Sequence, residues 1–378
     1  MSERRAALAY AAFEGKDYAA AAEHAAAAIN GGSQQAIQLR ALGAFIAYKQ
    51  RDYQTAIKAL EETFEATAGQ MGEMAVGMLI RLHLLTGDAK RGWELVRDSC
   101  RLNAFGPPLY PLPLWEGGAG ESLKGRRLVV WGAGYGDDIL FTRFIPKMTA
   151  AGATVYLNCR PRLVRLFSTL EGVADVLPLE QEAEDAEFQI HLGELPALFE
   201  AHRVENVWPG AYLRAEPRSL EAKGKRVGLV WGADSRHWEA TDRTVSLAEM
   251  SPLAEVPGVQ LFSLQYGPHA EQLSPPPEGM MVEELARDDR DFADAAATIA
   301  AMDLIITIDT ASANLAGALG KPVWVAVPYN PDWRWTMEGD TTPWYPTARV
   351  YRQTMPGEWR SVFRKMADDL KAETSAQS

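Results

Sequence analysis

The chain has 378 residues, enough for two or three domains of ordinary size. With 47% hydrophobic and 23% charged residues, its composition excludes a disordered or collagen-like chain. Fifty acidic against 38 basic residues leave a formal net charge of −12, which disfavours general binding to a nucleic-acid backbone. We therefore expect a folded protein without a nucleic-acid partner.

The cysteines and the apolar segments indicate the compartment. Cys100 and Cys159 lie far apart and lack the spacing that a zinc site or a disulfide framework needs. No window approaches 18 uninterrupted apolar residues, and the first residues lack a convincing signal-peptide cleavage site. The sequence predicts a cytoplasmic protein with no transmembrane segment.

Residues 1–102 show a helical pattern and contain three self-similar segments. EGKDYAAAAEHAAAAI, KQRDYQTAIKALEETF and LTGDAKRGWELVRDSC align so that Asp17, Asp52 and Asp88 recur at intervals of 35 and 36. This period is typical of stacked helix pairs and resembles tetratricopeptide repeats, although the third copy has Ala89 in place of the usual aromatic residue. Such a domain either presents a concave surface to a partner protein or serves as a packing and dimerisation module.

The rest of the chain alternates short β-rich runs with helical stretches. A linker rich in proline and glycine is expected over 103–125. The βα alternation predicts parallel sheets in an N-terminal half over 126–217 and a C-terminal half over 224–353, followed by a final helix over 354–378 that crosses back to the first half. Because parallel strands present loops and helix N-termini at their carboxyl ends, we expect ligands in a cleft between the two Rossmann-like halves.

A glycine-rich motif, GAGYGDD, follows the first predicted strand at residue 132. A dinucleotide fingerprint needs a third glycine where Asp137 stands, and a carboxylate at a helix N-terminus repels a pyrophosphate, so no NAD or FAD cofactor is predicted. Gly134 and Gly136 suggest a backbone that lets another substrate pass close to Asp137, whose carboxylate is then a candidate base. The alternative is that Asp137 is an ordinary helix cap.

A second motif, LIITIDTASANLAGALGKP, is a buried strand that runs directly into a helix rich in small residues. Thr310 and Ser312 supply hydroxyls beside free backbone N–H groups, an arrangement suited to the distal phosphate of a nucleotide. The alternative is a plain helix cap followed by residues that allow close packing.

These motifs, together with GYGDDILFTRFIP and PDWRW…PWYP, resemble bacterial tetratricopeptide-repeat glycosyltransferases of the GT-B type. Those enzymes are related to lipopolysaccharide heptosyltransferases and, more distantly, to protein O-linked N-acetylglucosamine transferases. The resemblance covers nearly the whole chain. It implies a helical repeat domain before an α/β GT-B fold, and transfer of a sugar from a nucleotide-diphosphate sugar to a protein or glycan acceptor, without a metal or a resident cofactor.

The resemblance also assigns roles to individual residues. It makes Asp137 the base, and places the donor phosphates on Asp309, Thr310 and Ser312. It places basic residues after the first strand of the C-terminal half, where this chain offers Arg236, His237 and Arg243. The relatives usually carry histidine where this chain has Asn314, which donates a hydrogen bond but carries no charge.

Further residues are candidates by position. Gln265 ends a predicted strand, where it either touches a nucleotide or is an ordinary strand-end side chain. Trp333 and Arg334 either form an aromatic wall with a phosphate-binding guanidinium or pack at a domain interface. The histidines His191, His202 and His269 are isolated, and the acidic run at 288–291 is typical of a first helical turn, so no metal site is predicted.

The leading hypothesis is a glycosyltransferase that binds a nucleotide sugar. Two alternatives stay open. One is a binding or scaffold protein that keeps the fold but has lost sugar transfer, an alternative suggested by Asn314. The other is a sugar-nucleotide epimerase on the same fold. The sugar, the nucleotide, the acceptor and the stereochemistry are not readable from the sequence.

Overall fold

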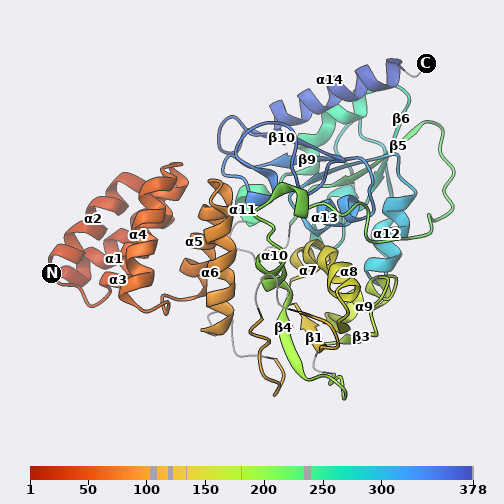
Figure 1. The fold of residues 1–378 in the computed structure, drawn as a ribbon. Helices are drawn as coiled ribbons and strands as arrows, with labels where there is room; N and C mark the ends of the chain where they lie inside the picture. The colour runs from red at the N-terminus through yellow and green to blue at the C-terminus, as the bar shows by residue number, and fades with distance from the viewer. Residues whose placement is uncertain (103–108, 118–121, 133, 180, 234–239, 377–378) are drawn as a thin grey trace. The chain divides into compact units, whose positions relative to one another are not determined.

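A computed structural model describes residues 1–102, 109–117, 122–132, 134–179, 181–233 and 240–376 (Figure 1). The chain divides into two compact units, Met1–Pro108 and Leu109–Ser378. The first is helical and the second is α/β, as predicted. In the described residues, no helix is both long and apolar enough to cross a membrane.

The first unit consists of helices that pack as consecutive pairs. Asp17, Asp52 and Asp88 each cap the second helix of a pair, accepting the backbone N–H of the residue three positions later at 3.1, 3.2 and 3.4 Å. The recurring aspartates therefore mark a repeated turn, which confirms the predicted helix pairs. The helices are α1 (Ser2–Glu14), α2 (Tyr18–Asn30), α3 (Ala36–Lys49), α4 (Tyr53–Ala66), α5 (Glu73–Leu85) and α6 (Ala89–Arg101).

Each repeated turn has the same backbone conformation. The residue before the capping aspartate has a positive φ in every copy, at Lys16 (60°), Arg51 (61°) and Gly87 (94°). In the third pair a Cβ on Gly92 would lie 2.6 Å from the Leu84 side chain, so only glycine allows α5 and α6 to approach this closely. In the third pair, the small residue after the turn is therefore a packing requirement.

The connector at 109–117 belongs to the second unit and is not a free linker. Leu114 forms a parallel bridge with Gln189, and Trp115 is buried. The Gln189 side chain accepts the Tyr110 N–H at 3.3 Å and donates to the Leu112 carbonyl at 2.6 Å. A buried glutamine thus ties this part of the predicted linker to the edge of the sheet.

The N-terminal half of the second unit is a parallel sheet in the order β3-β2-β1-β4. Its strands are short, and the central residues of β1 and β2 are buried, as expected where helices cover both faces of a parallel sheet. The elements are β1 (Arg127–Trp131), α7 (Tyr135–Phe141), α8 (Ile145–Ala150), β2 (Thr154–Cys159), α9 (Pro161–Phe167), β3 (Asp175–Pro178), β4 (Phe188–His191) and α10 (Leu195–Leu198).

The C-terminal half is a second parallel sheet, in the order β10-β9-β8-β5-β6-β7. Strands β8 and β9 are buried along their whole length and form its centre. The elements are β5 (Lys225–Val230), α11 (Ala240–Arg243), η4 (Leu247–Glu255), β6 (Val259–Ser263), β7 (Val282–Glu284), α12 (Phe292–Ala300), β8 (Leu304–Ile308), α13 (Ala311–Ala318), β9 (Val323–Val327), β10 (Ala348–Arg352) and α14 (Arg360–Ala376).

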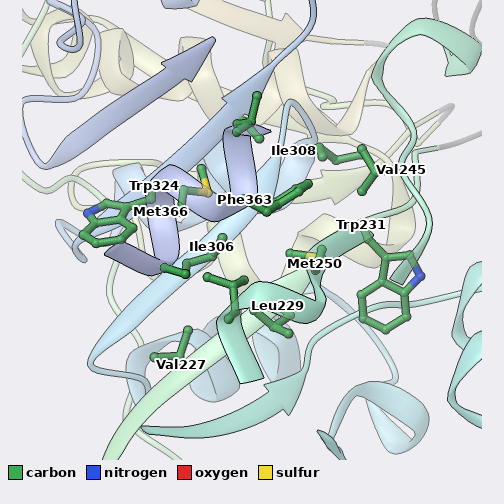
Figure 2. Close-up of a cluster of buried hydrophobic side chains, with 14 of the residues drawn as sticks. Val227, Leu229, Trp231, Val245, Met250, Ile306, Ile308, Trp324, Phe363 and Met366 are labelled. Carbon is green, nitrogen blue, oxygen red and sulfur yellow. The ribbon is translucent and has the colours of Figure 1, made fainter. Parts of the chain in front are cut away.

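The final helix α14 packs on the C-terminal half, in contrast to the predicted return to the N-terminal half. Phe363 and Met366 of α14 join a buried cluster with Leu229, Ile306 and Met250 (Figure 2). In Figure 1, α14 lies beside β10, which its residues contact. The apolar stripe of α14 therefore covers one face of the second sheet.

We expect Asp52→Ala to lower the free energy of unfolding of the first unit by about 1 kcal/mol, because it removes the cap of α4. Glu62→Ala, an exposed acid on the same helix, is the matched control and should change it by less than about 0.5 kcal/mol. Urea unfolding followed by helical circular dichroism measures both. Equal effects of the two variants would contradict the capping role.

Candidate functional site

The helices that follow β1 and β8 begin beside one another, although they belong to different halves. Helices α7 and α13 pack together, and a Cβ on Gly136 would lie 3.3 Å from Nδ2 of Asn314. A Cβ on Gly132 would lie 2.0 Å from Oδ1 of the buried Asp138. Close packing thus accounts for these two glycines, while passage of a substrate beside Gly134 stays a prediction.

Asp137 lies in the first turn of α7 with 56% of its side chain exposed. It does not cap the helix, because Gly134 occupies the cap position and no side-chain cap bond is made there. Instead, its carboxylate accepts a hydrogen bond from Nη2 of Arg334, which belongs to the C-terminal half. The candidate base is therefore paired with an arginine 197 positions away in the sequence.

Arg334 lies in the short turn η7 (Trp333–Trp335) and is only 13% exposed. Its Nη1 donates to Asp332 at 2.7 Å, and its guanidinium lies 4.3 Å from the centre of the Trp333 ring. Burial lowers the pKa of Arg334, but the carboxylates of Asp332, Asp137 and Asp309 outweigh burial and raise it overall. Arg334 is thus held in place as a permanent cation.

Arg243 places a second guanidinium near the end of β8. Its Nη1 donates to the Asp309 carbonyl at 3.2 Å and lies 3.8 Å from the Asp309 carboxylate. Burial, reinforced by the charge of Asp332, raises the pKa of Asp309 against the opposing effect of the two arginines. Asp309 is therefore a buried partner of Arg243.

Within the ranges that the structure describes, the guanidinium groups of Arg243 and Arg334 each have one unsatisfied hydrogen-bond donor. Across the described residues, the buried Nε–H groups of Arg243 and Arg334 have no acceptor. Buried donors are normally satisfied, and an unsatisfied one in a native protein calls for a missing partner. Each of the two groups therefore calls for an acceptor that the described residues do not supply.

The start of α13 adds polar groups at the same place. Thr310 occupies the cap position, where its hydroxyl lies 3.2 Å from that of Thr307, and Ser312 is half-buried in the first turn. Asn314 is buried, with its amide bonded to the Thr310 carbonyl at 3.4 Å and to the Tyr345 hydroxyl at 3.0 Å. Asn314 thus fixes the first turn of the helix.

Other predicted residues have different surroundings. Arg236 and His237 lie outside the described residues. The Gln265 side chain accepts the N–H groups of Trp231 and Gly232 at 3.0 and 2.7 Å and donates to two carbonyls, so it holds the loop after β5. Trp333 stacks on Phe141 of α7 at 6.4 Å and 8°, which is the interface packing considered as an alternative.

The sequence reasoning missed the fully buried Arg143, which joins the two halves. Its guanidinium donates to the carbonyls of Val207 and Trp344 at 3.0 and 2.8 Å, and lies 4.7 Å from the centre of the Tyr345 ring. A single arginine inside the apolar run DILFTRFIP was the available signal, because a buried cation needs partners elsewhere in the fold.

His191 ends β4 near Asp137, and sequence reasoning had set it aside. Its Nδ1 accepts the Gly193 N–H at 3.1 Å, and its ring lies edge-on to Trp131 with centroids 4.7 Å apart. Burial lowers the pKa of His191 to about 4, against the charge of Asp137, which raises it. The imidazole is therefore neutral at pH 7.

Two features lie apart from this site. In the acidic run, Asp291 caps α12 and pairs with Arg165 at 2.8 Å, and no group of three metal-binding side chains occurs among the described residues. A cavity of about 590 Å³ lies at the amino ends of β5 and β8, lined by Lys225 and Asp303 among others. Parallel sheets bind their ligands at the carboxyl ends of the strands. We therefore do not place a nucleotide-sugar ligand in that cavity.

Comparison with known proteins supports the fold. No protein-family model matches the sequence. The chain shares the fold of a glycosyltransferase family 9 structure from Veillonella parvula, with a TM-score of 0.50 and 13% identity over 69% of this chain and 100% of that one. The ADP-heptose lipopolysaccharide heptosyltransferase II of E. coli gives a TM-score of 0.48 and 14% identity, over 67% of this chain and 99% of that one.

A curated relative was found by sequence. The chain is 26% identical over 327 residues to Protein FlbA of Caulobacter vibrioides, covering 76% of this chain and 53% of that protein. The chain therefore spans about half the length of this relative.

We expect Arg143→Lys to lower the free energy of unfolding of the second unit by about 3 kcal/mol, because lysine leaves buried carbonyls without donors. Arg203→Lys, a 55% exposed position in the same half, should cost less than about 0.5 kcal/mol. Denaturant unfolding followed by tryptophan fluorescence measures both. A loss no larger than that of the control would contradict the bridging role.

The depressed pKa of His191 predicts a pH dependence of stability. Because the unfolded chain binds this proton near pH 6.5 and the folded protein only near pH 4, stability is present above pH 6.5 and is lost as the pH falls through this window. His191→Asn should remove a component on the order of 2 kcal/mol from that pH dependence. Unfolding at pH 7 and pH 4 tests this, with the exposed His202→Asn as control; parallel curves for wild type and His191→Asn would contradict it.

Proposed function

We propose that the protein is a glycosyltransferase that moves a sugar from a nucleotide-diphosphate sugar to a protein or glycan acceptor. The observation that carries this proposal is the pair of buried Nε–H donors, on Arg243 and Arg334, that have no acceptor within the described part of the chain. They lie at the carboxyl edge of a parallel sheet, where such folds bind nucleotides. The fold shared with a family 9 glycosyltransferase supports the same reaction class.

The donor diphosphate would occupy the start of α13. Arg243 and Arg334 would supply charge-assisted hydrogen bonds, and the first turn at Thr310 and Ser312 would supply N–H groups and hydroxyls. As the bond between the sugar carbon and the diphosphate oxygen breaks, negative charge grows on the diphosphate. The guanidinium groups stabilise that charge, which is the role that a metal has in other transferases.

The acceptor would approach from the N-terminal half. Its hydroxyl attacks the sugar carbon, and Asp137 takes the hydroxyl proton as general base. The half-exposed carboxylate of Asp137 at the start of α7 is suited to that contact. Gly134 would let the acceptor approach the backbone, while Gln265 and Trp333 hold the loops that frame the site.

We further propose that the tetratricopeptide-like helical unit presents the acceptor or joins copies of the chain into a homo-oligomer, in the cytoplasm. The repeated capped turns are the basis for this assignment. Arg236 and His237, which lie outside the described residues, stay predicted members of the donor site.

A non-catalytic binding protein is the second candidate. Both ends of the Asn314 amide are engaged inside the protein, by the Thr310 carbonyl and the Tyr345 hydroxyl. Because a side-chain amide is neutral, Asn314 also offers the leaving group no charge. Binding of a nucleotide without turnover would favour this function, and product formed without any acceptor would favour an epimerase.

We expect Arg243→Ala to weaken binding of the cognate nucleoside diphosphate at least tenfold, about 1.4 kcal/mol, because it removes a half-buried cation that would pair with the diphosphate. Asp137→Asn should keep that binding but lose transfer, because the amide cannot accept the proton. Calorimetry with ADP, GDP and UDP, and donor-hydrolysis assays with the matching sugar nucleotides, give both readouts.

The exposed Arg287, which pairs with Glu284 at 2.8 Å in the same half, gives the control. Arg287→Ala should leave binding and turnover unchanged. Absence of nucleoside diphosphate binding in the wild type, or equal losses in both arginine variants, would contradict the proposed function.

A further inference from the structure

We propose that Arg334 exchanges partners during the reaction: it holds Asp137 in the nucleotide-free protein and releases it when the donor diphosphate binds. The proposal rests on the proposed function, since it names the regulation of that same site. In it, Asp137 becomes available as a base only after the donor has arrived.

The first step of the argument is that the two partners of Arg334 are held differently. Asp332 accepts both the Arg334 backbone N–H at 3.0 Å and the Nη1 donor at 2.7 Å, within one short turn. The bond to Asp137 instead crosses between the halves and reaches a carboxylate that is 56% exposed. The contact with Asp137 is therefore the one that can open while the guanidinium stays anchored.

The second step concerns charge. Among the described residues, the carboxylates of Asp137, Asp332 and Asp309 form ion pairs with the guanidinium groups of Arg334 and Arg243. A diphosphate adds further negative charge to this cluster, and like charges at close range repel. The diphosphate can accept the Nη2 hydrogen bond of Arg334 only if the bond from Nη2 to Asp137 opens.

The third step concerns the base itself. In the structure, an oxygen of Asp137 accepts a hydrogen bond from the Arg334 guanidinium. While that oxygen accepts from Arg334, it is not free to accept the proton of an acceptor hydroxyl. Release of Asp137 by Arg334 therefore frees the oxygen for the acceptor and the guanidinium for the diphosphate.

Each bond, proton and electron pair of the reaction is accounted for when Arg334 exchanges partners. The acceptor oxygen forms a bond to the sugar carbon, its proton goes to Asp137, and the electron pair of the broken bond stays on the diphosphate. After the diphosphate leaves and Asp137 loses its proton to water, the pair with Arg334 forms again. Without a donor, Asp137 stays paired, so an acceptor bound alone is not activated.

The accessibility of the Asp137 carboxylate tests this exchange. Carbodiimide coupling to an amine modifies accessible carboxylates, and fragment mass spectrometry distinguishes Asp137 from the buried Asp138. We expect a severalfold increase in Asp137 modification when the full-length protein is saturated with whichever of ADP, GDP or UDP binds it by calorimetry. Arg334→Ala should show the increased modification without nucleotide and no further response.

The exposed ion pair of Arg214 and Glu171, at 2.8 Å, provides the control. Glu171 modification should rise in Arg214→Ala and should not respond to nucleotide. Nucleotide binding with unchanged or reduced Asp137 modification would overturn the exchange and leave the proposed function standing. Absence of binding by all three nucleotides would overturn both, and the wild-type comparison stays decisive even if Arg334→Ala does not fold.

Discussion

Two half-buried arginines, Arg243 and Arg334, pair with three carboxylates that follow β1, β8 and β9, and the candidate site depends on these pairs. Taking a guanidinium out of water is costly unless it is paired, and each of these two is paired with a carboxylate on one side. Each also keeps a buried Nε–H with no acceptor in the described chain. The fold thus places two guanidinium groups, each with a buried N–H donor that the described residues leave unsatisfied, at the edge of a parallel sheet.

A buried arginine with internal hydrogen-bond partners also joins the two halves of the second unit. Arg143 lies in η1 (Thr142–Phe144), directly after α7, and donates to carbonyls on both sides of the interface, surrounded by aromatic rings such as that of Tyr345. Its many donors match carbonyls whose positions only the folded interface fixes. Asp137 stands on α7, so the interface that Arg143 stabilises lies at the end of the helix that carries the candidate base.

Much of the architecture could be predicted from the sequence because periodic patterns report local structure. The spacing of Asp17, Asp52 and Asp88 gave the helix pairs, and the βα alternation gave two parallel sheets. The prediction that the final helix returns to the N-terminal half was wrong. The apolar face of an amphipathic helix does not specify which sheet the helix covers, and α14 covers the sheet of the C-terminal half. The predicted linker is partly built into the sheet edge through Gln189, a contact that no local pattern reveals.

The candidate site was predictable only in part. The helix starts at Asp137 and Thr310 follow from strand-to-helix motifs, whereas the pairing of Asp137 with Arg334 depends on long-range folding. Gly136 was interpreted as part of a passage for substrate. In the structure its lack of a side chain allows α7 and α13 to pack closely.

A crystal structure of the full chain with a bound nucleoside diphosphate is the most direct test of this account. We predict the diphosphate at the first turn of α13, within hydrogen-bonding distance of Nε of both Arg243 and Arg334. A diphosphate ordered at another edge of the sheet, or no ordered nucleotide at saturating ADP, GDP or UDP, would contradict it.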